Sequence, residues 1–118
     1  MRDPFHAELS EVSLAQVMNG LSDPLRLRIV TLLGDQGEME CWRIYETLGI
    51  SKSNASHHFR VLRECGLIRR THTGQQQSAS LRRAEFDDRF PGLLDSVLKV
   101  SSAEQGEIAL ATRSDRDA

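Results

Sequence analysis

The 118-residue sequence lacks any long apolar stretch and has only two cysteines, Cys41 and Cys65. No apolar run approaches the roughly 20 residues of a membrane-spanning helix. The first residues, MRDPFH, lack the apolar core of a signal peptide. Two thiols form at most one bridge, which excludes the disulfide framework of a small secreted protein. We therefore expect a cytoplasmic protein with reduced thiols.

The chain is also too short for two domains of ordinary size. Hydrophobic residues make up 39% and charged residues 27%, a balance typical of a folded globular domain. A core this small gains stability when two copies pair, so a dimer is expected. We predict an N-terminal tail over 1–8, one domain over 9–100 and a mobile C-terminal tail over 101–118.

No constellation typical of an enzyme is recognisable in the sequence. There is no nucleophile with a partnered base, no glycine-rich phosphate loop and no set of metal ligands at a known spacing. We therefore expect neither catalysis nor a cofactor, and we turn to binding functions.

The distribution of charge points to one class of partner. The whole chain carries −2, which by itself argues against binding a nucleic acid. Residues 51–83, however, hold seven basic residues and a single acid, Glu64, a net of +6 that leaves −8 on the rest. An acidic body with one basic face is expected for contact with a polyanion. Chance clustering on a solvated surface would give the same count, so the periodicity of the segment must decide.

Hydrophobic spacing predicts a mainly α-helical fold with one small β-hairpin. Ser22 and Asp23 before Pro24 mark the start of a helix, and Gly34 with Gly37 marks its end. The five predicted helices span 9–20, 24–33, 41–48, 52–65 and 86–98, the last of them restarting near Pro91. The hairpin strands are predicted at 67–73 and 78–83, around a polar tip at 74–77.

Two of these helices form a helix-turn-helix. The segments 41–48 and 52–65 are joined by Gly49, which can adopt the left-handed conformation of a sharp turn, and Ser51 can cap the second helix. Small polar and basic side chains on its outer face suit the DNA major groove, where Arg60 can donate to guanine and Asn54 can read adenine. The candidate DNA-binding residues of this helix are Lys52, Ser53, Asn54, Ser56, His57 and Arg60.

The hairpin that follows is a wing. Its basic side chains suit the DNA backbone or the neighbouring minor groove. Because strand neighbours point to opposite faces, only some of them can reach DNA. The candidates here are Arg70, His72, Gln75 and Arg82.

Three stretches of the sequence resemble the ArsR-type winged helix-turn-helix regulators of bacteria. They are residues 21–33 (LSDPLRLRIVTLL), 48–63 (LGISKSNASHHFRVLR) and 64–68 (ECGLI). The resemblance covers about 9–98. It implies a homodimer, formed by the first and last helices, that binds an imperfect palindrome near its own promoter and blocks transcription until a signal releases it. The apolar candidates for that interface are Leu9, Val12, Val17, Phe86, Phe90, Leu94 and Val97.

The signal is not evident from the sequence. Members of the family that sense metals use Cys-x-Cys at the start of the third helix, where this chain has only Cys41. A second family site needs histidines in the last helix, and 84–101 has none, so we predict no metal. Cys41 and Cys65 on apolar faces are expected to be buried, although a thiol switch would suit the same two residues.

The mode of control also stays open. A small organic effector between the dimerising helices, or control by abundance alone, would suit the same sequence. The competing function is a winged helix that binds another protein. His58 is expected at the edge of the core, and Trp42 and Tyr45 are expected to be core or supporting residues.

Overall fold

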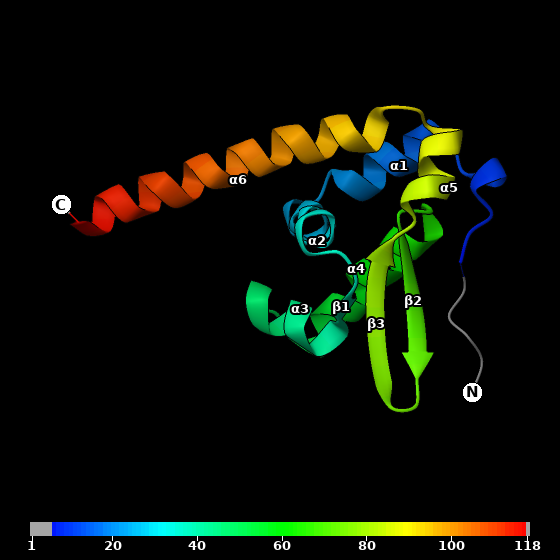
Figure 1. Cartoon of the computed structure of the whole chain (residues 1–118), viewed down its shortest axis with the longest axis horizontal. Coiled ribbons are helices and arrows are strands. Elements are labelled where there is room, and N and C mark those ends of the chain that lie inside the picture. Colours follow the sequence, from blue (N-terminus) through cyan, green and yellow to red (C-terminus); the bar gives the residue numbers. More distant parts are fainter. Residues whose placement is uncertain (1–5, 118) are drawn as a thin grey trace.

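The structure, a computed structural model, describes residues 6–117, with side chains through residue 106. Within this range, six α-helices and a three-stranded antiparallel sheet form a winged helix-turn-helix (Figure 1). In chain order they are the 3-10 turn η1 (Leu9–Glu11), α1 (Leu14–Leu21), α2 (Pro24–Gln36), β1 (Met39–Glu40), α3 (Cys41–Leu48), α4 (Lys52–Glu64), β2 (Ile68–Thr73), β3 (Gln76–Leu81), α5 (Arg83–Arg89) and α6 (Leu93–Asp117). No helix in the described part of the chain is long and apolar enough to cross a membrane.

Local capping chemistry fixes where the central helices start. The Asp23 carboxylate accepts hydrogen bonds from the backbone N–H groups of Leu25 and Arg26 at 2.9 and 3.0 Å, and Pro24 occupies the first helical position. Ser51 caps α4 by accepting from the Asn54 N–H. The predicted helix at 41–48 is confirmed, and the one at 52–65 is confirmed to within one residue. α2 starts at Pro24 as predicted but continues past Gly34 to Gln36.

The predicted first helix is wrong in its extent. The segment 9–20 is divided into η1 and α1 by an extended stretch at Val12 and Ser13. Ser13 and Gln16 form a reciprocal capping box, with side-chain to backbone distances of 2.8 and 3.2 Å, that starts α1 afresh. The Ser-x-x-Gln spacing in the sequence was the available signal.

The sheet contains one more strand than the predicted hairpin. β3 lies between β2 and the short β1, with Met39 opposite Ala79 and Glu40 opposite Ser78. The hairpin turn is at Gly74, which has a φ of +64°, and β3 begins at Gln76, two residues earlier than predicted. β1 therefore links the wing to the start of α3.

The last helix also differs from the prediction. The break near Pro91 is confirmed, because α5 ends at Arg89 and α6 begins at Leu93. α6 then continues to Asp117 and projects beyond the body of the molecule (Figure 1). The predicted boundary at residue 100 falls inside α6, and Ser101 belongs to the folded body, because it is buried and its hydroxyl lies 2.7 Å from that of Thr31. The predicted tail at 1–8 falls partly outside the described residues, but Ala7 within it is buried.

The core lies where α2, α3, α4 and the sheet meet. Its largest fully buried side chains include Phe59, Phe86, Ile29, Leu33 and Ile44. The helices α2 and α6 approach closely at Gly34, where an added Cβ would lie 2.9 Å from a methyl carbon of Leu98. This packing holds α4 and the wing on one side of the molecule and α6 on the other (Figure 1).

Candidate nucleic-acid interface

The helices α3 and α4 meet at a turn that only a few residue types adopt easily. Gly49 has φ 66° and ψ 38°, the left-handed region that ends α3. Ser51 is extended and caps the next helix. Ala55, Phe59 and Leu62 then bury one face of α4 against the core, which fixes the rotation of the helix about its axis.

That rotation exposes all the predicted recognition residues of α4. They share one outer surface, which we call the recognition surface: Lys52, Ser53, Asn54, Ser56, His57 and Arg60. A guanidinium nitrogen of Arg60 lies 3.5 Å from Nδ1 of His57, and the Ser56 hydroxyl donates to the Lys52 carbonyl at 2.9 Å. These side chains offer donors and acceptors of the kind that read base edges and phosphates.

The wing, defined as β2 and β3 with their turn, lies beside α4 (Figure 1). Gln75 is exposed at its tip, and His72 is half-buried on β2. Arg70 is also half-buried: its guanidinium lies 5.6 Å from the centre of the Phe59 ring and donates to Gln77. It thus braces the wing against α4, which is at odds with a free phosphate contact.

The predicted DNA contact of Arg82 is wrong. Its side chain is buried and donates to the Ala7 carbonyl at 2.7 Å and to Glu85 at 2.6 Å. Arg69 is exposed instead, and it pairs with the other oxygen of Glu85. The sequence carried a signal for this arrangement. Residues two apart on a strand share a face, so the apolar Ile68 predicts that Arg70 faces inward and Arg69 outward.

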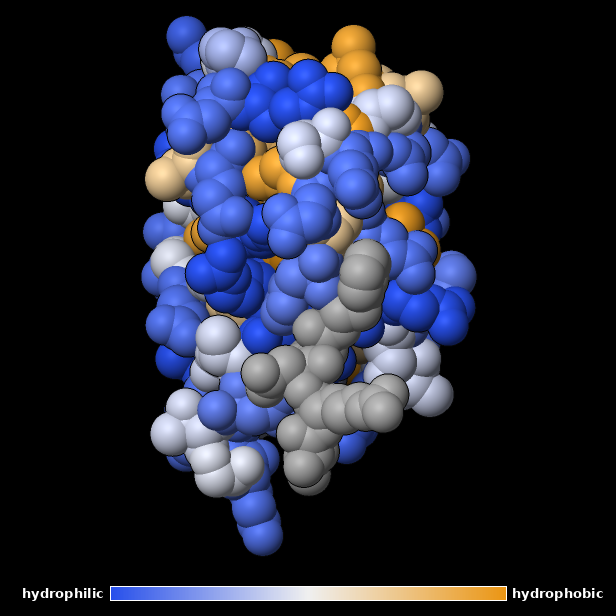
Figure 2. Space-filling model, turned by 90° about the vertical axis from the view of Figure 1, so that its right-hand side faces the viewer, coloured by the Kyte–Doolittle hydropathy of each residue, from blue (hydrophilic) through white to orange (hydrophobic). Residues whose placement is uncertain are grey.

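Polar residues dominate the molecule on the wing side. Figure 2 shows this face, which lies to the right in Figure 1, and hydrophilic residues cover most of it. Arg83 pairs there with Asp95 at 2.9 Å, so two of the exposed arginines at the ends of the wing are already matched by carboxylates. On α4, by contrast, Lys52 and Arg60 are exposed, and none of the ion pairs of the described residues engages them.

The predicted dimer residues prove to be core residues in six of seven cases. Buried within the chain are Leu9, Val12, Val17, Phe86, Phe90 and Leu94, and only Val97 is half-exposed. The large apolar side chains that the fold leaves open beside α6 are Leu14, Met18 and Val100, which are 52%, 45% and 59% exposed. Helical spacing in the sequence identified the apolar faces. It did not show which of these faces are buried within one chain and which remain exposed.

His58 and the two cysteines are withdrawn from solvent. His58 is buried on the inner side of α4, with Nδ1 3.3 Å from an Arg26 nitrogen and 4.0 Å from the Asp23 carboxylate. Burial lowers its pKa. Burial also raises the pKa of Cys41 and brings that of Cys65 to about 11, so both are thiols near neutrality.

Two further outcomes concern Trp42 and the metal ligands. Trp42 and Tyr45 were expected to be core or supporting residues; Trp42 is not in the core, since it is 57% exposed at the start of α3, whereas Tyr45 packs on Phe59 as a supporting residue. Among the residues that the structure describes, no three His, Cys, Asp or Glu side chains are grouped so that they could hold a metal ion.

Comparison with known proteins identifies the family. The family model described as bacterial regulatory protein, arsR family, matches residues 23–70, which span α2, the helix-turn-helix and the start of the wing. The chain is 37% identical over 84 residues to the uncharacterized HTH-type transcriptional regulator YceK of Bacillus subtilis, covering 70% of this chain and 84% of that protein. It is 34% identical over 95 residues to the HTH-type transcriptional regulator CmtR of Mycobacterium tuberculosis, covering 80% of each.

The fold agrees with this assignment. The solution structure of a homodimeric winged helix-turn-helix DNA-binding domain from Mycobacterium bovis aligns with a TM-score of 0.58 and 23% identity, over 81% of this chain and 78% of that one. The chain belongs to the ArsR family of bacterial regulatory proteins, as an HTH-type transcriptional regulator that binds DNA.

Proposed function

We propose that the protein acts as a homodimeric repressor that binds an imperfect palindrome near its own promoter. In this complex α4 enters the major groove, and the wing tip, with Gln75 and His72, contacts the minor groove or the backbone. The observation that carries the proposal is the recognition surface: six polar or basic side chains share the open face of α4, and none of them is needed by the core.

The apolar surface beside α6 supports a dimer. Leu14 and Met18 on α1 and Val100 on α6 are exposed, and a groove of about 490 Å³ is lined by Met18, Leu21, Leu27, Val97 and Val100, together with polar residues at its edge. A second copy of the chain presents the same surface, so a two-fold interface covers both grooves at once. A two-fold dimer also matches the two-fold symmetry of a palindromic site.

Binding rather than catalysis is the proposed mode of action. A dimer seated on promoter DNA blocks access of the polymerase, so occupancy alone represses. The positive recognition surface supplies phosphate contacts, and their contribution falls as salt rises. Lys52 and Arg60 contact the phosphates. Asn54, His57 and Arg60 reach the edges of the bases.

The proposal is tested by selecting bound duplexes from a random DNA library with the purified full chain. We expect an inverted repeat to be enriched, with binding that weakens steeply with salt. In fluorescence anisotropy, Arg60→Ala should reduce specific affinity by about 1–3 kcal/mol. The matched control Arg28→Ala, an exposed arginine of α2, should leave it unchanged.

Two results would contradict the proposal. Equal, weak binding to every duplex would favour the winged helix as a protein-binding module. Equal effects of Arg60→Ala and Arg28→Ala would mean that α4 does not enter the groove.

A further inference from the structure

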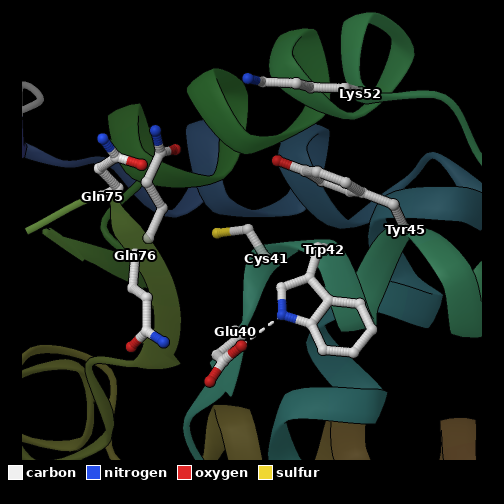
Figure 3. A pocket seen from close by; sticks show the side chains of 8 residues that line it. Glu40, Cys41, Trp42, Tyr45, Lys52, Gln75 and Gln76 are labelled. Atoms are coloured by element: carbon white, nitrogen blue, oxygen red, sulfur yellow. Dashed lines mark hydrogen bonds between the residues drawn. The ribbon is translucent and has the colours of Figure 1, made fainter. Parts of the chain in front are cut away.

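We propose that a cavity between α3, the start of α4 and the wing tip binds a small aromatic carboxylate, and that this ligand releases the protein from DNA. The cavity has a volume of about 370 Å³, a size typical of small-molecule sites. Its lining comes from β1, α3, α4 and the wing: Glu40, Cys41, Trp42, Tyr45, Lys52, Gln75, Gln76 and Gln77 (Figure 3). The part about release rests on the proposed function, whereas the binding site does not.

Two aromatic side chains of α3 form one wall. Trp42 and Tyr45 are three residues apart and therefore share a side of the helix. The Trp42 indole is 57% exposed and donates its N–H to Glu40, which fixes the plane of the ring. The Tyr45 ring packs on Phe59, with ring centres 5.8 Å apart, and its hydroxyl points toward the cavity (Figure 3). Fixed rings of this kind favour a planar aromatic ligand.

The charge around the cavity favours an anion. Lys52 extends across its rim from α4, and the thiol of Cys41, between Tyr45 and Trp42 in the view, points toward Gln76 (Figure 3). The guanidinium of Arg70 donates to Gln77, which also lines the cavity, so a second cation lies behind that wall. Glu40 is the one carboxylate of the lining, and it lies on the opposite side of the cavity from Lys52, where it accepts the Trp42 N–H (Figure 3). An anion therefore binds at the Lys52 side.

The polar groups on the far side come from the wing. Gln75 and Gln76 enter from the tip (Figure 3), and their amides can both donate and accept hydrogen bonds. A ligand with an aromatic ring against Trp42 and a carboxylate at Lys52 therefore matches the lining. An uncharged aromatic ligand would contact Trp42 but not pair with Lys52, and a small anion would pair with Lys52 but not contact Trp42.

Occupancy of this cavity competes with DNA. Lys52 and Gln75 border the cavity, and both belong to the surface that we assign to DNA. A ligand carboxylate that pairs with Lys52 keeps this side chain from pairing with a DNA phosphate. A ligand ring beside Gln75 keeps the wing tip from contacting DNA. Ligand and DNA therefore weaken each other to the same degree, because coupling between two binding equilibria is reciprocal.

Isothermal titration calorimetry on the DNA-free full chain tests the site directly. The probe is 1-naphthoate, with 1-naphthalenemethanol as the uncharged analogue and inorganic phosphate as the anion without a ring. We expect naphthoate to bind about tenfold more tightly than the alcohol, as for one charge-assisted contact, and phosphate not to bind. Trp42→Ala and Lys52→Gln should each weaken naphthoate binding about tenfold.

The matched control is Arg43→Gln, a loss of charge at an exposed α3 residue outside the lining, which should not alter naphthoate affinity. Trp42 is largely exposed, so its replacement leaves the core intact, and circular dichroism verifies this. Naphthoate that binds no better than the alcohol would overturn the proposal. Phosphate that binds as strongly as naphthoate would also overturn it, since the cavity would then be a binding site for a phosphate group of the DNA backbone.

Displacement of selected DNA, followed by anisotropy, tests the second part. Naphthoate should release DNA from the unaltered protein and fail to release it from Trp42→Ala. Binding without displacement would overturn the regulatory part. If the protein binds naphthoate in calorimetry but selects no DNA from the library, the ligand site is supported and the proposed function is contradicted.

Discussion

Thr31 and Ser101 are 70 residues apart in the sequence, yet their hydroxyl oxygens lie 2.7 Å apart in a buried hydrogen bond. The Thr31 hydroxyl also lies 2.7 Å from the Leu27 carbonyl, and the Gln105 amide donates to Ser101 at 2.9 Å. This chain of polar contacts ties α2, in the centre of the fold, to α6.

Removal of either hydroxyl should loosen that connection. We expect Thr31→Val and Ser101→Ala each to lower the free energy of unfolding by about 1 kcal/mol. In urea titrations the double variant should lose less than the sum of the two, because both changes delete the same bond. Strict additivity would show that the bond contributes nothing to stability.

The burial of Arg82 predicts a structural role. Arg82→Ala leaves the Ala7 carbonyl and Glu85 without its donors, so we expect a loss of about 1.5–3 kcal/mol in urea unfolding. Arg69→Ala removes the exposed partner of the same Glu85 and should cost less than about 1 kcal/mol. DNA affinity, measured where both variants are folded, should depend on Arg82 only through stability. An Arg82→Ala protein of normal stability and reduced affinity would restore Arg82 as a DNA contact.

Stability should fall with mild acid because of His58. Burial holds the pKa of His58 below its ordinary value of 6.5, with Arg26 and His57 acting in the same direction and Asp23 opposing them. The unfolded chain therefore takes up a proton first, and stability is lost as the pH falls below about 6.5. We expect urea midpoints at pH 7.5 and 5.5 to differ less in His58→Gln than in the unaltered chain.

His57→Gln removes one of the charges that lower the pKa of His58, so it should reduce the acid sensitivity slightly, and less than His58→Gln does. The pKa of Asp23 is lowered chiefly by the backbone hydrogen bond from Arg26, and its contribution disappears only as the pH falls below about 3.8. The two effects therefore occupy separate pH ranges. Equal acid sensitivity in His58→Gln and the unaltered chain would refute the assignment.

The exposed apolar residues of α1 predict which changes split the dimer. Met18→Glu places a charge in the apolar groove, and we expect sedimentation to show folded monomers. Ala15→Glu, on the same helix but outside the groove lining, should remain dimeric. A substitution at the buried Leu94 should instead lower the thermal midpoint. A dimer that survives Met18→Glu would require another interface.

Two glycines with positive φ should respond differently to alanine. At Gly66, with φ +79°, an added Cβ would lie 2.1 Å from Cδ2 of Leu9, whereas at Gly49, with φ +66°, it would meet nothing within 4 Å. Gly49→Ala should therefore cost about 1–2 kcal/mol of backbone strain. Gly66→Ala should cost more, because η1 must also move, and equal losses in thermal unfolding would contradict this.

The sequence predicted the features that depend on neighbouring residues. Asp23 before Pro24 and the Gly49 turn are local signals, and both helix starts follow from them. The pairing of β1 with β3 was not predictable, since Met39 meets Ala79 across 40 residues. The same holds for Arg82, whose partner Ala7 is 75 residues away. The recognition face of α4 followed from helical periodicity, whereas the exposed α1 residues depend on how the whole chain packs.

The strand β1 has a mechanical consequence. It is hydrogen-bonded to β3 of the wing and continues directly into α3, so the wing and the helix-turn-helix share one rigid frame. In the proposed complex, the distance along DNA between the major-groove contact of α4 and the contact of the wing is therefore set by the protein. An operator with one base pair inserted between these two contacts would engage one or the other, but not both.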